Sequence, residues 1–274
     1  MPLLDFPPEL LLLIGEYLSV KDISRFLRAN RYLSCLLTPR FHKLALEDIG
    51  SLTALQWAAC HGYASLAELV LSKGAGVKEF KRGRWGRRTP LHIAAAENYP
   101  DVIRVLAKRR RWINIRDGLR STPLHAAASR RSLQAIRVLL ELGADMTCAD
   151  HRGQTPVHIS ASQGDVDSMR AFIDASWDFS TADPLGWTVL HDAILGGKGM
   201  VEFLLENGGK GFINVQDILG KTLLHCTVSG PLVCEEVTRL LCRYGADMEV
   251  KDYSGKTPMD LAIEGGRESW LERS

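Results

Sequence analysis

Hydrophobic residues recur along most of the chain in short clusters with helical spacing, separated by turns that contain glycine and aspartate. Ile136, Leu139 and Leu140 stand at positions i, i+3 and i+4, which is the spacing of one buried helix face. Glycine follows the helical segments at Gly143 and Gly245, where it can cap a helix in the left-handed conformation. The pattern predicts an all-α fold built from short helices.

A tetrapeptide repeats through the same region. Its copies occupy residues 89–92, 122–125, 155–158, 188–191 and 222–225, with weaker copies at 53–56 and 257–260. The first two copies read Thr-Pro-Leu-His, and successive threonines are 33 to 36 residues apart. An Asp-x-x-Gly-x-Thr turn leads into four of the copies. This period and tetrapeptide resemble the ankyrin repeat. The resemblance covers about residues 51–274 and implies an α-solenoid of about six full repeats and a truncated seventh.

Each position of the tetrapeptide has a structural role. Threonine can cap the first helix of a repeat, and proline suits the first helical position, where no amide hydrogen is needed. Leucine is expected in the core. Histidine can use one ring nitrogen within its repeat and the other toward the backbone of the next. The alternative role is metal ligation or base catalysis, but the repeat separates the five histidines along the solenoid, so no single site can gather them. They are His92, His125, His158, His191 and His225.

Residues 1–50 do not follow the period and are predicted to form three short helices. They resemble an F-box at Phe6–Leu10, Ile14, Tyr17–Leu18, Asp22–Ile23, Phe26, Arg28–Arg31 and Leu33. In that family these helices bind a Skp-type adaptor of cullin–RING ubiquitin ligases. The resemblance places four residues near the adaptor: Pro8, Leu11, Ile14 and Ile23. An F-box-like start followed by an ankyrin array is similar to the layout of F-box/ankyrin proteins of filamentous fungi.

The F-box resemblance has one departure. The tryptophan common late in that motif is absent, and Leu36 or Leu37 stands near its place. A second interpretation therefore stays open, in which residues 1–50 are a helical cap that closes the end of the solenoid, since terminal repeats need capping.

Composition limits the class of protein further. Hydrophobic residues make up 46% of the chain and charged residues 24%, as in soluble folded proteins. The six cysteines include no CxxC pair and are expected to be reduced thiols without metal. The apolar run Leu10–Ile14 is shorter than the about 20 residues of a membrane span, and no basic region precedes it. We expect an intracellular protein, cytoplasmic or nuclear, with no membrane segment.

Charge is segregated along the sequence. Residues 78–131 hold 15 Lys or Arg and 4 Asp or Glu, a net charge of +11, whereas residues 132–274 hold 12 basic and 21 acidic residues, a net charge of −9. One basic run surrounds Trp85 and a second spans Lys108–Arg111. These runs could bind an acidic protein segment, act as a nuclear-import signal, bind nucleic acid or simply be solvated. We expect an acidic protein partner, not nucleic acid.

No enzymatic motif is present. The sequence contains no Gly-rich phosphate loop, His-Glu-x-x-His or nucleophile elbow, and no strand is predicted before Gly196, Gly197 and Gly199. We therefore expect a monomeric binding module with no cofactor, which binds a protein on its concave face or hairpin tips. It is a substrate receptor of a ubiquitin ligase or, alternatively, a scaffold or inhibitor with no ligase link. The candidate contact residues at the tips are Arg82, Arg84, Trp85, Arg87, Leu119, Arg120, Arg152, Leu185, Trp187, Leu219 and Tyr253.

Overall fold

The computed structural model describes residues 54–72, 88–108, 112–229 and 232–271. The F-box-like segment 1–50 lies outside these ranges, so its three helices and its boundary with the array at residues 50 and 51 stay predictions.

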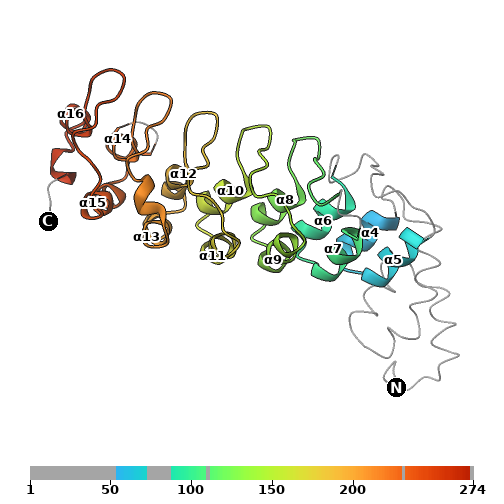
Figure 1. The fold of residues 1–274 in the computed structure, drawn as a ribbon. Coiled ribbons are helices and arrows are strands. Elements are labelled where there is room, and N and C mark those ends of the chain that lie inside the picture. The colour runs from blue at the N-terminus through green and yellow to red at the C-terminus, as the bar shows by residue number, and fades with distance from the viewer. Residues whose placement is uncertain (1–53, 73–87, 109–111, 230–231, 272–274) are drawn as a thin grey trace, which may run out of the picture.

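Within the described ranges the chain forms two parallel rows of short helices (Figure 1). The first row contains α4 Ala54–His61, α6 Pro90–Ala96, α8 Pro123–Ser129, α10 Pro156–Ser162, α12 Val189–Leu195, α14 Leu223–Val228 and α16 Pro258–Glu264. The second row contains α5 Ala64–Ser72, α7 Pro100–Leu106, α9 Leu133–Glu141, α11 Val166–Asp174, α13 Lys198–Glu206 and α15 Glu235–Arg243. Two 3-10 helices, η3 Gly209–Phe212 and η4 Glu268–Trp270, follow α13 and α16.

Most helices contact the next helix of their own row, and the two helices of each pair from α4 and α5 to α14 and α15 contact each other. Hairpin loops project from the first row in one direction (Figure 1). The described residues contain no β-strand, only an isolated bridge between Ala182 and Thr188. The predicted all-helical solenoid is confirmed.

The first helices from α6 to α16 each begin after the threonine of the tetrapeptide, as predicted. Thr89 is the N-cap of α6, and Pro90 occupies its first turn. The Thr89 hydroxyl oxygen accepts the His92 backbone N–H at 3.4 Å, and the Thr89 N–H donates to Nδ1 of His92 at 3.3 Å. This reciprocal capping box satisfies two amides that the helix itself leaves without acceptors. The same arrangement starts α8, α12 and α14.

The core lies between the two rows of helices. Leu91, Leu124 and Leu190, which follow the N-cap of successive first helices by two residues, are buried, as is Leu139 of a second helix. Apolar residues of every described repeat thus contribute to a continuous core that no repeat could bury alone.

Replacing Leu124 by Ala is expected to lower the free energy of unfolding by about 2–5 kcal/mol, because the side chain is fully buried and its loss leaves a cavity. Urea titration followed by circular dichroism measures the change. Leu119→Ala is the matched control, since Leu119 is exposed in the preceding turn and should change the midpoint little. Equal effects of the two variants would contradict the assignment of Leu124 to the core.

Candidate protein-binding surface

Five hairpin turns project from the array at residues 117–121, 150–154, 183–187, 217–221 and 252–256. Each begins with an aspartate whose Oδ1 accepts the backbone N–H groups two and four residues later, at 2.8 to 3.1 Å. The aspartates are Asp117, Asp150, Asp183, Asp217 and Asp252. A short carboxylate is suited to this role because it can bond to its own backbone in a turn. These carboxylates therefore shape the turns.

Backbone hydrogen bonds join most neighbouring turns. The N–H of His151 donates to the Leu119 carbonyl at 3.0 Å, that of Ile218 to Leu185 at 3.1 Å and that of Tyr253 to Leu219 at 3.0 Å. Pro184 occupies the donor position between the second and third turns and has no N–H. Instead it packs on Gly153, where a Cβ would stand 2.1 Å from Pro184 Cδ. The spacing of the tips is thereby fixed by contacts between the turns.

Most of the predicted tip residues that the structure describes are exposed. The exposed fractions are 53% for Leu119, 51% for Leu185, 57% for Leu219 and 78% for Tyr253. Arg120 and Arg152 are exposed as well. Sequence reasoning missed Ile218, which is 56% exposed. Ile218 follows its turn aspartate directly, as the predicted tip residue Tyr253 does, and this shared position could have identified it from sequence.

Arg120 has an unusual backbone conformation. Its φ is 60°, whereas the same place in the other four turns is taken by glycine with positive φ: Gly153, Gly186, Gly220 and Gly255. A side chain in this left-handed region costs about 1–2 kcal/mol. Backbone strain is often found at functional sites. The strained, exposed arginine therefore fits a role in contact with a partner.

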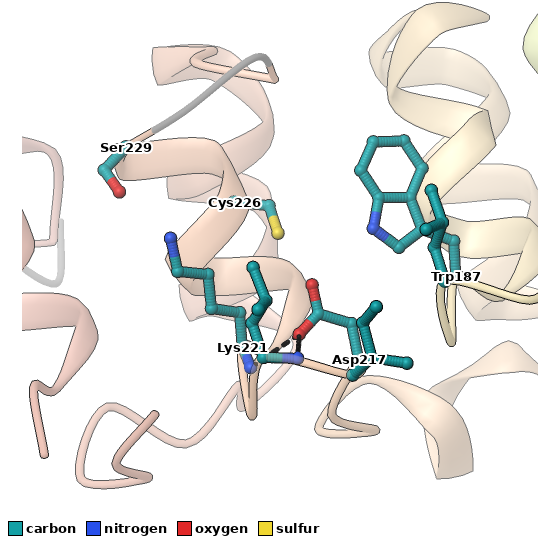
Figure 2. A pocket seen from close by; sticks show the side chains of 8 residues that line it. Trp187, Asp217, Lys221, Cys226 and Ser229 are labelled. Atoms are coloured by element: carbon teal, nitrogen blue, oxygen red, sulfur yellow. Dashed lines mark hydrogen bonds between the residues drawn. The ribbon is translucent and has the colours of Figure 1, made fainter. Parts of the chain in front are cut away.

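A groove of about 220 Å³ lies between the third and fourth turns (Figure 2). One side is formed by Leu185 and Trp187, the other by the turn that begins at Asp217, and the remaining lining comes from α14. The complete lining is Leu185, Trp187, Asp217, Ile218, Leu219, Lys221, Cys226 and Ser229. The groove thus brings together three of the residues predicted from sequence, Leu185, Trp187 and Leu219.

Trp187 differs from the other predicted tip residues, because its side chain is only partly exposed and packs against the core. Its ring is stacked on the ring of His191, with centroids 5.8 Å apart and planes at 16°. It forms a wall of the groove and faces the Cys226 side across it (Figure 2). Trp187 is therefore suited to form part of a rigid contact surface, and it does not project as an anchor.

An unexpected carboxylate lies in the first helix of the same repeat. Asp192 of α12 is buried in the position that Ile93, Ala126 and Cys226 occupy in other repeats. Burial, with a smaller contribution from the negative charge of Asp183, raises the pKa of Asp192 to about 7. Sequence analysis did not single out this residue, although a charged side chain directly after the histidine breaks the pattern of the other copies.

Three of the five histidines, His92, His125 and His225, link neighbouring repeats, as predicted. Nδ1 of each ring bonds to the threonine of its own repeat. Nε2 of His92 lies 2.9 Å from the Ser121 carbonyl, and Nε2 of His125 lies 3.0 Å from that of Gln154. Because a carbonyl only accepts, Nε2 carries the proton. Nε2 of His191 has no hydrogen-bond partner among the described residues.

The described residues show no arrangement typical of a metal site or a membrane span. Nowhere in these ranges do three His, Cys, Asp or Glu side chains converge as ligands for a metal ion. None of the helices in these ranges combines the length and the apolar character needed to cross a membrane. The described cysteines, Cys60, Cys148, Cys226, Cys234 and Cys242, are free thiols.

Several predicted contact residues lie outside the described ranges. These are Pro8, Leu11, Ile14 and Ile23 near the N-terminus and Arg82, Arg84, Trp85 and Arg87 of the first basic run. At the edges of the two basic runs, Arg88 lies 3.7 Å from the Asp117 carboxylate, and Lys108 forms an ion pair with Glu68. These two cations therefore also hold neighbouring repeats together.

Comparison with known proteins agrees with this architecture. The family model described as Ankyrin repeats (3 copies) matches residues 32–117, 55–150 and 124–217, and its first match begins within the F-box-like segment. No curated protein matches the chain.

Solved structures share the fold. The ankyrin repeat domain of Bcl-3, described as a unique member of the IkappaB protein family, has a TM-score of 0.69 and 25% identity, over 79% of this chain and 96% of that one. The human ASB11 ankyrin repeat domain has a TM-score of 0.65 and 24% identity, over 80% of this chain and 96% of that one. A third similar chain comes from the complex of the Bdellovibrio bacteriovorus predatory endopeptidase Bd0816 with immunity protein Bd3460. It has a TM-score of 0.56 and 24% identity, over 66% of this chain and 95% of that one.

Ankyrin-repeat proteins bind protein partners and are typically non-enzymatic scaffolds. The matches to the family model together span more than half of the 274 residues. The chain therefore belongs to the ankyrin-repeat family, and its array is a protein–protein interaction module.

Proposed function

We propose that this chain is a substrate-recognition subunit of a Skp–cullin–F-box ubiquitin ligase. In this proposal residues 1–50 bind a Skp-type adaptor, and the ankyrin array holds the protein to be modified. The turn face of the array is the main support on the substrate side, because it presents exposed leucine, tyrosine and arginine side chains on a stiff base of linked turns. The F-box-like sequence of residues 6–33 supports the adaptor side.

The competing function is a scaffold or inhibitor without a ligase link, in which residues 1–50 only cap the array. The similarity to the Bcl-3 structure, an ankyrin repeat domain of the IkappaB family, is compatible with this alternative. The two functions share the array and differ in what the N-terminal segment binds.

Changing Pro8 to Ala together with Leu11 to Glu is expected to abolish binding of a purified Skp-type adaptor, because the pair alters the start and the apolar face of the predicted first helix. The array should stay folded. Co-purification with the adaptor measures binding, and circular dichroism measures the fold of the array.

Leu119→Glu serves as the control, since it places the same charge on an exposed leucine of the array and should leave adaptor binding intact. Deletion of residues 1–50 separates the two functions. If the intact chain never binds the adaptor and the deletion makes the array unfold or aggregate, the segment is a cap and the ligase role is wrong.

A further inference from the structure

The turn face carries an apolar strip at its C-terminal part, defined here as Leu185, Trp187, Ile218, Leu219 and Tyr253. The three turns that supply it are joined by the hydrogen bonds from Ile218 to Leu185 and from Tyr253 to Leu219. Tyr253 also lies directly over Gly220, where a Cβ would stand 2.5 Å from the tyrosine ring. The strip is therefore a continuous, preformed surface.

The groove within this strip has room for one large side chain. Its volume of about 220 Å³ is below the about 300–1,000 Å³ of pockets that enclose small ligands. Leu185, Ile218 and Leu219 line it while more than half exposed. Exposed apolar surface that surrounds a defined hollow is characteristic of a place where a partner inserts an apolar anchor.

The charged residues that line the groove indicate which charge the partner segment carries beside its apolar anchor. Asp183 and Asp217 direct Oδ1 at backbone N–H groups of their own turns. Lys221, by contrast, lines the groove and forms no ion pair with any other described residue. Lys221 is thus the charged side chain of the lining that is left to pair with a partner.

We propose that the groove binds an acidic segment of a partner protein, which inserts one large apolar side chain between Leu185 and Leu219 and places a carboxylate near Lys221. The proposal rests on the function of the array as an interaction module and is independent of the ligase link. A phosphate group of a nucleic acid could also pair with Lys221, but it could not fill the apolar part of the lining.

The test uses the full chain and fluorescein-labelled peptide pools, with binding measured by fluorescence anisotropy. The acidic pool has Leu or Phe at its centre and Asp and Glu in its flanks. The serine pool has the same acidic flanks with Ser at its centre, and the basic pool has Leu or Phe at its centre with Lys and Arg in its flanks. We expect the acidic pool with an apolar centre to bind about tenfold more tightly than the serine pool or the basic pool. High salt should weaken this binding.

Variants then locate the site. Leu185→Ser with Leu219→Ser should weaken binding of the acidic pool about tenfold or more. Leu119→Ser is the matched control, because Leu119 has the same place in its turn and similar exposure but lies outside the groove. Lys221→Glu should shift the preference from acidic toward basic flanks. All these side chains are at least partly exposed, so the array should keep its circular dichroism spectrum.

The proposal is overturned if the basic pool binds better, if an apolar centre gives no advantage, or if Leu119→Ser weakens binding as much as the groove variant. Preferential binding of a single-stranded RNA oligonucleotide would also overturn it. The combined Pro8→Ala and Leu11→Glu variant should keep full peptide binding, so that loss of the adaptor and loss of the groove are separate results.

Discussion

Lowering the pH from 7 to 4 is expected to unfold the array, because its buried histidines are neutral in the folded state. Burial lowers the pKa of His92 and of His191 from 6.5 to about 4. Burial also lowers the pKa of His125, His158 and His225. For His92 and His191 the shift corresponds to about 3 kcal/mol each, a large part of the about 5–15 kcal/mol that stabilises a typical domain.

The direction follows from proton uptake on unfolding. Between pH 6.5 and 4 an unfolded histidine is protonated and a buried one is not, so the unfolded state binds more protons. The stabilisation is complete above pH 6.5 and is lost as the pH falls toward 4. Asp192 acts in the opposite direction over this range, because its raised pKa makes the folded state bind the extra proton. One carboxylate offsets only part of the effect of five histidines.

Urea titrations at intervals between pH 7.5 and 4.5 measure this dependence. His92→Gln should flatten it by up to about 1.4 kcal/mol per pH unit, the value for one proton. Glutamine is a suitable replacement, since Gln56 occupies the histidine position of the first repeat and its Nε2 donates to the Arg88 carbonyl at 3.5 Å. His151→Gln, at an exposed ring in a hairpin turn, should leave the profile unchanged. Stability that is constant from pH 7 to pH 4.5 would contradict the prediction.

The repeat fold could be predicted because its determinants are local in sequence. Thr89, Pro90 and His92 specify a helix start within four residues, and each turn aspartate specifies its own turn. The period then requires such units to stack.

The groove could not be predicted in the same way, because it depends on how neighbouring turns approach each other. Trp187 and Leu219 were identified singly as tip residues, but the pattern did not indicate that they share a hollow with Cys226. Ile218 was missed because one exposed aliphatic residue is ordinary in a soluble protein. Asp192 was missed because burial of a position in a first helix follows from its three-dimensional neighbours, and an acidic residue is usually exposed.

Replacing Asp192 by Ala is expected to stabilise the protein by about 2–4 kcal/mol at pH 8, which is unusual for the loss of a native side chain. The carboxylate is buried, and it has a folded pKa of about 7 against the ordinary 3.8. No side-chain hydrogen bond joins it to any other described residue, so ionisation near pH 8 leaves a poorly compensated buried charge. Ala126 fills the corresponding position in α8 and shows that a small apolar residue fits there.

The pH dependence distinguishes charge from packing. The contribution of a group with a raised pKa is most favourable below pH 3.8 and is lost as the pH rises through 7, so the advantage of Asp192→Ala should shrink as the pH falls from 8 toward 5. Asp192→Asn keeps the shape and removes the charge, and it should show the same pH-dependent gain. Asp174→Ala, at an exposed carboxylate of α11, should give the wild-type profile. Denaturant titrations in which Asp192→Ala is less stable than the wild type at pH 8 would show that the carboxylate has stabilising contacts, and the prediction would be wrong.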